Sequence, residues 1–306
     1  GTASTMACLS EILGMALPGN GTIPAVDSRR HQLAEQSGFQ IVKMVSENIT
    51  PSQIMTNKAF ENSIIGLHAL GGSTNAIIHL TAIAGRLSID LPLDLFDQFS
   101  RNTPVITNLK PSGQFLMEDF HYAGGMQAVI KEISPLLSPE EKSVSGLKIS
   151  ELATFARNDN KAVIKSLDDP IYPEGGLAVL RGSLAPKGAV IKHSAASAKF
   201  LNHTGRVIVF DSHDQITDNI NSENLDIKDE DILVLKNSGP KGAPGMPEWG
   251  FLPIPNKLLK KGTRDMVRIS DARMSGTAFG TVVVHVSPES ALENSAMAAV
   301  KTGDTV

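Results

Sequence analysis

The sequence predicts an α/β fold combined with a β-barrel: a helix-rich N-terminal part of an incomplete α/β domain precedes a C-terminal β-barrel domain. With 306 residues, the chain is longer than a typical domain of about 100–150 residues, so two domains are expected. Apolar residues recur at helical spacing up to about residue 157, whereas short β-branched runs follow Pro173. The composition changes near DDPIYPEGG, so the predicted domains are residues 1–172 and 173–306.

The N-terminal part is predicted to be helical from its first residues. The first helix is TASTMACLSEILGMAL, which ends at Pro18-Gly19, and the second is RRHQLAEQSGFQIVKMVSEN. A third helix begins at Thr50-Pro51, with the threonine as N-cap and the proline in the first helical position. The residues expected on one apolar face of the second helix are Ala34, Ile41, Val42 and Val45. Further helices are expected over residues 73–86, 92–102, 118–137 and 148–157.

The C-terminal part is predicted to consist mainly of strands. Six short runs rich in β-branched residues indicate them: GLAVLRG, AVIKHS, RVIVFD, DILVLKN, MVRIS and GTVVVHV. One helix is expected near residues 213–222. Many short strands with few helices are typical of a β-barrel or a sandwich.

Composition and charge exclude several classes of protein. The 28 basic and 32 acidic residues give a net charge of −4, which indicates no nucleic-acid-binding surface. There is no run of about 18 apolar residues that could span a bilayer, and the N-terminus lacks the basic start of a signal peptide. We therefore expect a cytoplasmic protein without a membrane partner. The single cysteine, Cys8, can neither form an intrachain disulfide nor by itself supply a zinc or iron–sulfur ligand set.

Two glycine-containing stretches of the N-terminal part are interpreted as turns. GNGTIP, residues 19–24, has a proline where a dinucleotide-binding motif needs its third glycine, so it is expected to end a helix. GGSTN, residues 71–75, joins two predicted helices, and Ser73 or Thr74 is placed to cap the second. The free N–H groups of that helix start could also face an anion, although a tight corner is the favoured interpretation.

One loop of the C-terminal part carries a single acid on a constrained backbone. NSGPKGAPGMPEWG, from Asn237 to Gly250, has four glycines, three prolines and one carboxylate, Glu248. Proline fixes φ and glycine permits turns that other residues disfavour, so this loop can hold the carboxylate rigidly. Mg²⁺ is typically bound by one or two protein carboxylates, with substrate and water in its other positions. The alternative is a rigid hairpin connection with a solvated acid.

A second polar loop, SDARMSGTAFG, follows the predicted strand MVRIS. Residues just past a strand end are well placed to point into a site on a rigid scaffold. Four polar residues alternate here, so a strand-like stretch would place them on one face: Asp271, Arg273, Ser275 and Thr277. A polar strand connection is the alternative. The presence of two rigid polar loops in one domain favours a site.

These segments together resemble the dihydroxy-acid and sugar-acid dehydratase family, which includes 6-phosphogluconate dehydratase and the pentonate dehydratases. The matching segments, in family order across nearly the whole chain, are GTASTMACLSEILGMALPGNGTIPAVDSRR, ALGGSTN, LMEDFHYAGG, EGGLAVLRGSLAPKGAVIK, GPKGAPGMPEWGFLPIP and RISDARMSGTAFGTVVVHVSPES. PEWGFLPIP and RDMVRISDARMSGTAFG look most like the branch acting on arabinonate- or xylonate-type acids. The alternative within the family is dihydroxy-acid dehydratase of branched-chain amino-acid biosynthesis.

The resemblance implies a hydro-lyase that removes water from a 2,3-dihydroxy acid and yields a 2-keto-3-deoxy acid. It also implies Mg²⁺ and an iron–sulfur cluster, expected to be 2Fe-2S. Glu248 matches the family's Mg²⁺-ligating glutamate, and Ser275 matches the serine proposed to act, as an alkoxide, as the base at C2. Thr277 would lie beside that serine and orient it or the substrate, and Arg273 would neutralise the substrate carboxylate.

The resemblance also implies that part of the site is missing from this sequence. The family's cluster cysteines, its other acidic metal ligands and its modified metal-site lysine belong N-terminal to GTASTM, where this chain has not begun. Cys8 is therefore expected to be a packing residue, and the chain alone is expected to be inactive. A homo-oligomer, a dimer or tetramer, is expected from the family. The alternative from another class is a non-catalytic anion-binding module that uses GGSTN.

Overall fold

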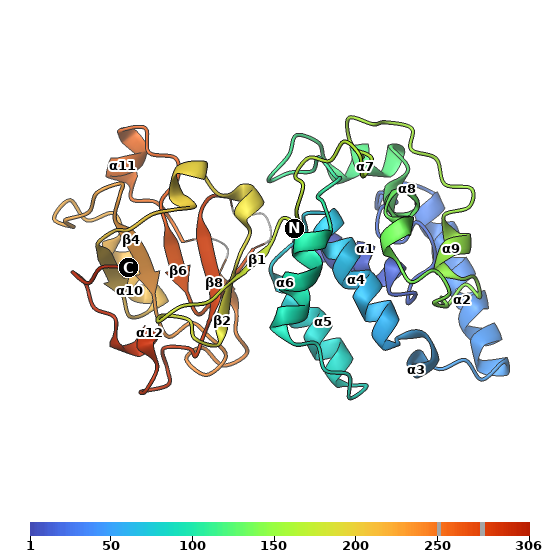
Figure 1. Cartoon of the computed structure of the whole chain (residues 1–306), viewed down its shortest axis with the longest axis horizontal. Coiled ribbons are helices and arrows are strands. Elements are labelled where there is room, and N and C mark those ends of the chain that lie inside the picture. Colours follow the sequence, from blue (N-terminus) through green and yellow to red (C-terminus); the bar gives the residue numbers. More distant parts are fainter. Residues whose placement is uncertain (250–251, 276–278) are drawn as a thin grey trace. The chain divides into compact units, whose positions relative to one another are not determined.

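The computed structural model describes residues 1–249, 252–275 and 279–306, without the side chains of Glu248 and Trp249. The chain divides into two compact units, Gly1–Gly176 and Leu177–Val306, each of which is described by itself (Figure 1). The regular secondary structure of the first unit is helical, and the second contains a six-stranded sheet. In the described part of the chain, no helix combines the length and the apolar character needed to cross a membrane.

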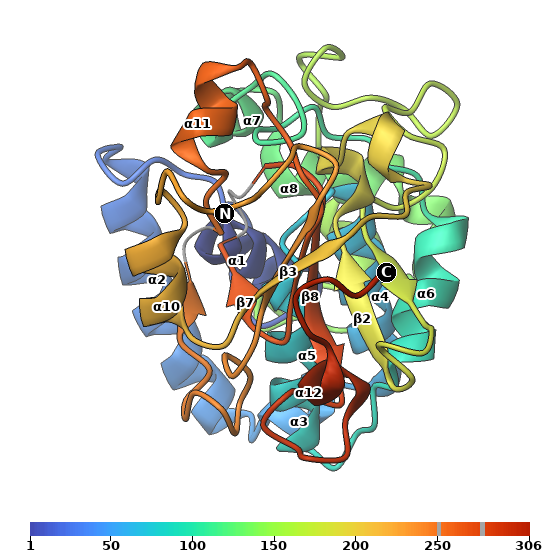
Figure 2. The same cartoon turned by 90° about the vertical axis from the view of Figure 1, so that its left-hand side faces the viewer.

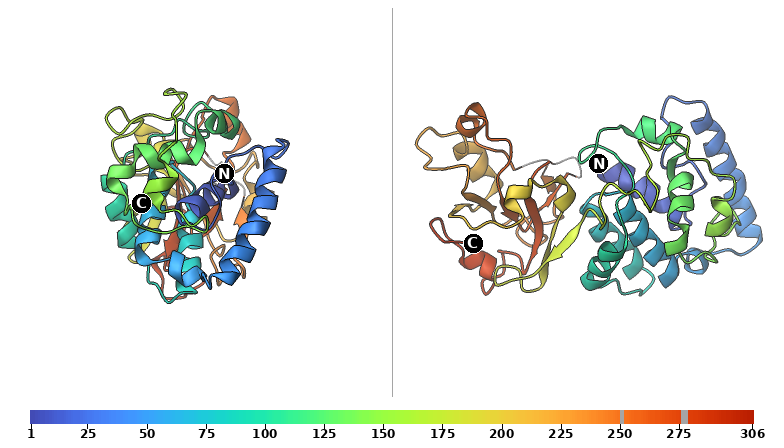
Figure 3. Two further views of the ribbon diagram at one scale, coloured as in Figure 1. Left: turned by 90° about the vertical axis from the view of Figure 1, so that its right-hand side faces the viewer. Right: turned by 45° about the horizontal axis from the view of Figure 1, so that its top comes forward.

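The unit Gly1–Gly176 is built around one buried helix, α4 (Asn57–Ala69). This helix contacts α1, α5, α6 and α8, and most of its residues are buried, as expected of a helix surrounded by others (Figure 3). The remaining α-helices of the unit are α1 (Thr2–Ile12), α2 (Arg29–Ser46), α3 (Pro51–Ile54), α5 (Asn75–Gly85), α6 (Leu93–Asn102), α7 (Met117–Tyr122), α8 (Gly125–Glu132) and α9 (Ile149–Leu152).

The first helix is shorter than predicted. α1 ends at Ile12 instead of reaching Pro18, because Gly14 follows with φ at +83°. A glycine in this left-handed conformation just past the last helical turn is a common helix terminator. The chain therefore leaves the helix before the GNGTIP turn, which stands as a separate turn after it.

The predicted apolar face of α2 is wrong. All four residues expected on it are exposed: Ala34, Ile41, Val42 and Val45. The helix instead buries Leu33 and Met44, and Met44 packs in a small cluster with Ile54 and Val144. The neighbouring segments decide which side of an amphipathic helix meets the core, and the β-branched residues of α2 fall on the other side.

The predicted N-cap at Thr50 is confirmed. The side chain of Gln53 accepts a hydrogen bond from the Thr50 backbone N–H at 2.8 Å, which completes a capping box at the start of α3. The segment is nevertheless divided into two helices. Thr56 begins α4 because its hydroxyl accepts a hydrogen bond from the backbone N–H of Ala59 at 3.1 Å.

All six predicted strand runs of the second unit contain a strand of one sheet. These strands are β1 (Ala178–Leu180), β2 (Gly188–Ile191), β3 (Val207–Phe210), β4 (Ile232–Leu235), β6 (Arg268–Ser270) and β8 (Val282–Ser287). The helix expected near residues 213–222 is α10 (His213–Asn219). Two short helices were not predicted, α11 (Asn256–Lys260) and α12 (Ala296–Ala299).

The predicted β-barrel is not confirmed. The strand order is β1-β2-β8-β6-β4-β3, so in the described part of the chain β1 and β3 are the edges of an open sheet (Figure 2). The β1-β2-β8 pairs are antiparallel, whereas β8, β6, β4 and β3 pair in parallel. The barrel was expected because six short strands with one predicted helix are typical of a β-barrel or a sandwich. α10 instead connects β3 to β4, and a helical crossover of this kind produces parallel neighbours.

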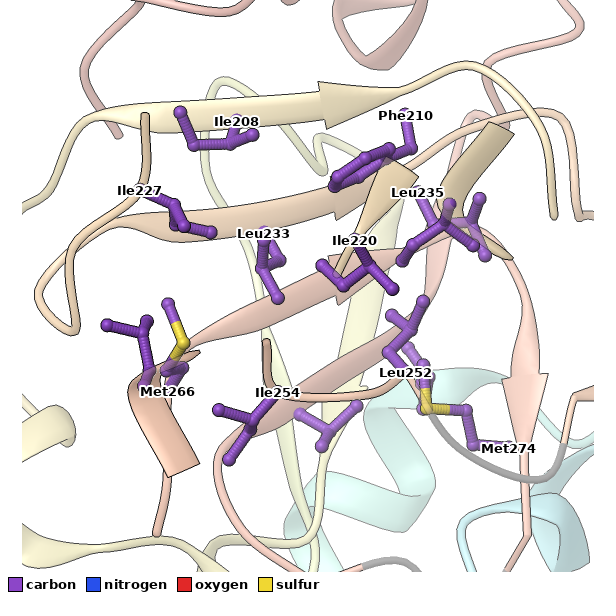
Figure 4. Close-up of a cluster of buried hydrophobic side chains, with 14 residues drawn as sticks. Ile208, Phe210, Ile220, Ile227, Leu233, Leu235, Leu252, Ile254, Met266 and Met274 are labelled. Atoms are coloured by element: carbon purple, nitrogen blue, oxygen red, sulfur yellow. The ribbon is translucent and has the colours of Figure 1, made fainter. Parts of the chain in front are cut away.

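Apolar residues cover both faces of the sheet. Along β4, Leu233 and Leu235 point to one face, and Ile232 and Val234 point to the other. The first face packs against α10 and against segments on either side of α11 (Figure 4). Besides Leu233 and Leu235, that core includes Ile208, Phe210, Ile216, Ile220, Leu252, Ile254, Leu258, Met266 and Met274.

Candidate active site

The structure brings together the two polar loops singled out from the sequence. We call residues 237–249 the glycine loop and residues 271–275 the serine loop. Each contains a two-residue strand, β5 (Glu248–Trp249) and β7 (Arg273–Met274), and these strands pair in parallel. Glu248 is in register with Arg273. The proposed metal ligand and the proposed substrate-binding residue are therefore backbone neighbours.

The base of the glycine loop is held by a carboxylate from elsewhere in the unit, Glu289. Its Oε2 accepts hydrogen bonds from the backbone N–H groups of Lys241, at 2.8 Å, and Gly242, at 2.9 Å. Glu289 is buried, with 8% of its surface exposed. A buried carboxylate that accepts backbone N–H groups forms strong charge-assisted hydrogen bonds, so this contact fixes the loop at its turn.

Asp271 also fixes the glycine loop. It is buried, and its carboxylate accepts hydrogen bonds from the backbone N–H of Ser238 at 3.0 Å and from the hydroxyl of Ser290 at 2.6 Å. The Ser290 hydroxyl in turn accepts from the backbone N–H of Asn237 at 2.7 Å. Asp271 therefore helps to hold the glycine loop, whereas the two-residue strand of the serine loop begins at Arg273.

Arg273 connects the two loops through its side chain. Its Nε donates to the backbone carbonyl of Met246 at 2.6 Å, two residues before Glu248. Met246 has φ at +44°, a conformation that is unfavourable for a residue with a side chain and that often occurs at functional sites. Arg273 is half-buried, so its positive charge lies close to the loop backbone.

The serine loop ends at Ser275, one of the two proposed catalytic residues. Ser275 directly follows β7 and is half-buried, whereas Thr277 lies outside the described residues. Met274, next to Ser275, belongs to the same buried cluster as Leu252, which follows the glycine loop. Both loops are thus anchored in one hydrophobic core.

A histidine that the sequence analysis did not single out lies near Arg273. Burial, and secondarily the charge of Arg273, lowers the pKa of His285 to about 4. Its Nε2 is buried and has no hydrogen-bond partner among the described residues. The imidazole is therefore neutral near pH 7 and adds no second cation beside Arg273. A histidine within the apolar run TVVVHV was the available signal in the sequence.

The described residues supply no complete metal site. They contain no group of three or more His, Cys, Asp or Glu side chains placed to hold a metal ion. Cys8 is a packing residue, as predicted: it is a free thiol, 1% exposed, and burial raises its pKa. A thiol that remains protonated in a core is a poor metal ligand.

The GGSTN segment forms a corner between α4 and α5. The hydroxyl of Ser73 accepts a hydrogen bond from the backbone N–H of Asn75 at 3.2 Å and lies 3.0 Å from the hydroxyl of Thr2. The backbone N–H of Ser73 donates to the hydroxyl of Thr5 at 3.2 Å. The polar groups of this corner thus bond to α1 and to one another, in agreement with the predicted tight corner.

The sequence analysis missed the charged residues that hold the loops. Glu289 lies in the segment SPES and Arg268 in the strand MVRIS, and neither was assigned a role. A charged residue inside an apolar strand was the signal for Arg268, because a buried charge requires a partner. That partner is Asp265, whose carboxylate Oδ1 lies 3.1 Å from the Arg268 guanidinium.

Comparison with known proteins places the chain in one family. Residues 1–152 match the description dihydroxy-acid/6-phosphogluconate dehydratase N-terminal, and residues 162–306 match the corresponding C-terminal description. Together the two matches cover almost the whole chain.

Three relatives indicate the range of activities found among similar proteins. An L-arabonate dehydratase from Azospirillum brasilense is 52% identical, and the match covers 98% of this chain and 52% of the relative. An L-arabinonate dehydratase from Rhizobium leguminosarum bv. trifolii is 53% identical, covering 97% and 52%. A dihydroxy-acid dehydratase from Caldanaerobacter subterraneus subsp. tengcongensis is 43% identical, covering 100% and 54%. The chain spans about half the length of these curated relatives.

Proposed function

This chain belongs to the dihydroxy-acid/6-phosphogluconate dehydratase family, and from that membership we propose that the protein is a sugar-acid dehydratase. As a hydro-lyase it would convert an aldonate such as arabinonate or xylonate to the 2-keto-3-deoxy acid. The observation that carries the proposal is the 52% and 53% identity to arabonate and arabinonate dehydratases over nearly the whole chain. Dihydroxy-acid dehydratase of branched-chain amino-acid biosynthesis is the second candidate, supported by the 43% identical relative.

The proposed reaction removes a proton from C2 and hydroxide from C3 of the substrate, and the resulting enol tautomerises to the keto acid. A C–H bond beside a carboxylate is a weak acid, so the negative charge that develops on the carboxylate must be neutralised. Glu248 is proposed to ligate Mg²⁺, which would supply that neutralisation. A single carboxylate on a fixed loop fits this ion, which commonly takes few protein ligands.

Ser275 is proposed as the base that accepts the C2 proton. A serine hydroxyl is ordinarily too weak an acid to lose its own proton near neutral pH, so it needs positive charge nearby. Arg273 supplies a cation two residues before Ser275 and in register with Glu248. It is also proposed to bind the substrate carboxylate. Thr277 is proposed to orient the serine or the substrate.

The residues of this chain do not fit an iron–sulfur cluster. Cys8 is the single cysteine and is buried in the core of the unit Gly1–Gly176. We therefore propose that the family's cluster, expected to be 2Fe-2S, takes its ligands from residues outside this sequence, and that this chain alone is inactive. We also propose a cytoplasmic homo-oligomer, either a dimer or a tetramer.

A substrate panel tests the proposed function. The full-length protein containing this sequence is assayed without oxygen for 2-keto acid formation from arabinonate, xylonate and 2,3-dihydroxyisovalerate. Turnover of a pentonate is expected. Turnover of 2,3-dihydroxyisovalerate alone would establish the second candidate. If none of these acids yields a keto acid and the GGSTN corner binds a simple anion, the non-catalytic module is correct.

Replacement of the proposed base tests its role. Ser275→Ala is expected to lower kcat by about 10²-fold or more, because general-base catalysis contributes on that scale. Ser150→Ala is the control, since Ser150 is exposed on α9 and its hydroxyl makes no hydrogen bond to the described residues. A Ser275→Ala enzyme with wild-type kcat would remove the base assignment.

A further inference from the structure

Arg268 carries a positive charge in the hydrophobic core of the unit Leu177–Val306. It lies on the central strand β6 and is 0% exposed. On the neighbouring strands it is in register with Leu233 and Val282, both apolar. A charge is costly to bury unless it is paired and hydrogen-bonded. The groups that bind the Arg268 guanidinium therefore indicate the role of this residue.

The counter-charge of Arg268 is Asp265, which is itself held in place. Thr281 donates to Asp265 through both its backbone N–H and its hydroxyl, each at 2.8 Å, and the backbone N–H of Ser197 donates at 3.1 Å. Burial opposes ionisation, but these hydrogen bonds outweigh it and hold the pKa of Asp265 below its ordinary value. Arg268 and Asp265 thus form a fixed ion pair inside the unit.

The two terminal nitrogens of Arg268 bind backbone carbonyls that follow the two polar loops in the sequence. Nη1 donates to the backbone carbonyl of Leu252 at 3.1 Å, and Nη2 donates to the backbone carbonyl of Phe279 at 2.9 Å. Leu252 comes four residues after Glu248, and Phe279 comes four residues after Ser275. One planar group therefore fixes the points at which the chain leaves the proposed metal ligand and the proposed base.

The other ends of the same loops are joined independently of Arg268. Asp271 binds Ser238 at the start of the glycine loop, and the Arg273 side chain binds Met246 in its later part. Arg268 is thus the link on the C-terminal side of the two loops. Among the described residues, the other links between the two loops are the Asp271–Ser238 and Arg273–Met246 hydrogen bonds and the short β5–β7 pair.

We propose that Arg268 is a positioning residue of the active site, which sets the separation of Glu248 and Ser275 by clamping the exits of both loops. This proposal rests on the proposed function for its catalytic consequence. The proposed effect of Arg268 on the positions of the two loops does not depend on any substrate. A lysine could keep the pairing with Asp265, but its single nitrogen lacks the planar fork that reaches both carbonyls at once.

The test uses Arg268→Lys and Arg268→Met in the full-length holoenzyme, with Arg206→Met as the matched control. Arg206 also pairs with buried Asp231, at 2.8 Å, but does so beside the edge strand β3. Hydrogen exchange is measured for peptides covering residues 252–258 and 279–285, and for β3 and β4. Arg268→Lys is expected to raise exchange in the two loop-exit peptides while β3 and β4 remain protected. Arg206→Met is expected to leave the loop-exit peptides unchanged.

Kinetics supply the second measurement. Arg268→Lys is expected to lower kcat by about tenfold or more with little change in KM, because small displacements of reacting groups slow the chemical step. Unchanged exchange at both loop exits would overturn the proposal, as would a uniform increase over the whole unit. If Arg268→Met does not fold, the lysine variant decides. Absence of turnover by the wild-type enzyme would overturn the proposed function alone, because the exchange result stands without it.

Discussion

Glu11 and Glu289 hold glycine-containing turns in the two units by the same contacts, yet only one of these turns leads to the candidate site. Glu11 accepts hydrogen bonds from the backbone N–H groups of Gly19, at 2.9 Å, and Gly21, at 2.5 Å. Glu289 accepts them from Lys241 and Gly242. Each glutamate is buried, but Glu11 lies 8 and 10 residues from the N–H groups that it binds, whereas Glu289 lies 48 and 47 residues away. A turn of this kind is therefore a structural device in both units.

What distinguishes the two turns is the residue that follows. After the turn held by Glu11, the chain continues into α2, which contributes Met44 to a small hydrophobic cluster. After the turn held by Glu289, the chain continues to Glu248 and the pairing with Arg273. A rigid glycine turn is therefore not by itself evidence of a site. The evidence is the polar residue that follows the turn and lies beside a second polar loop.

The largest expected difference between the two turns comes from replacing Glu289 and Glu11 with alanine. In the full-length enzyme, Glu289→Ala is expected to lower kcat by about 10²-fold, because a shift of roughly 1 Å in a catalytic group has that effect. Glu11→Ala removes the acceptor of the half-buried Gly19 and Gly21 N–H groups and of the Gln127 side-chain amide, and is expected to cost about 1–3 kcal/mol of stability. Its kcat per folded molecule is expected to remain within about threefold of wild type. Steady-state kinetics and thermal melts measure both effects, and equal losses of kcat would break the comparison.

A smaller contrast is expected from adding a methyl group to each turn. A Cβ on Gly242 would lie 2.7 Å from the Asn237 backbone, and a Cβ on Gly21 would lie 2.8 Å from the backbone of Ala7 and Cys8. Both alanine variants are expected to lose about 1–3 kcal/mol of stability through overpacking. Only Gly242→Ala is expected to raise the Mg²⁺ concentration needed for half-maximal activity. An unchanged Mg²⁺ requirement would separate the glycine loop from the metal site.

The smallest expected effect is a change with pH in the contribution of Glu11 to the stability of the fold. Burial raises the pKa of Glu11, although hydrogen bonds from Gly21, Gly19 and Gln127 favour its ionised form. Because the folded pKa lies above the unfolded value of about 4.3, this group's contribution to stability is fully present below that pH. It is lost as the pH rises through the folded pKa. The urea midpoint of wild type minus that of Glu11→Gln should therefore fall with rising pH, and a constant difference would contradict the assignment.

The local elements of the second unit were largely predictable, but the arrangement of the sheet was not. Runs such as RVIVFD and DILVLKN form β3 and β4 because β-branched residues favour extended backbone. Which strands become neighbours depends on how the segments that connect them pack. The individual strand sequences therefore did not indicate the order β8-β6-β4-β3 or its parallel pairing. The predicted buried face of α2 was wrong for a similar reason, since Met44 packs against Ile54 and against Val144, which is far away in the sequence.

The candidate site, too, was predictable from the sequence only in part. The sequence by itself determined the family, the two polar loops and the residue types that suit the chemistry, including Glu248, Arg273 and Ser275. Only the tertiary structure decided that Glu248 and Arg273 are in register. It alone also revealed the carboxylates and the guanidinium that hold the loops. A motif identifies residue types that lie close together in the sequence. A hydrogen bond between segments that are far apart in the sequence forms only when the chain folds, so a motif does not reveal it.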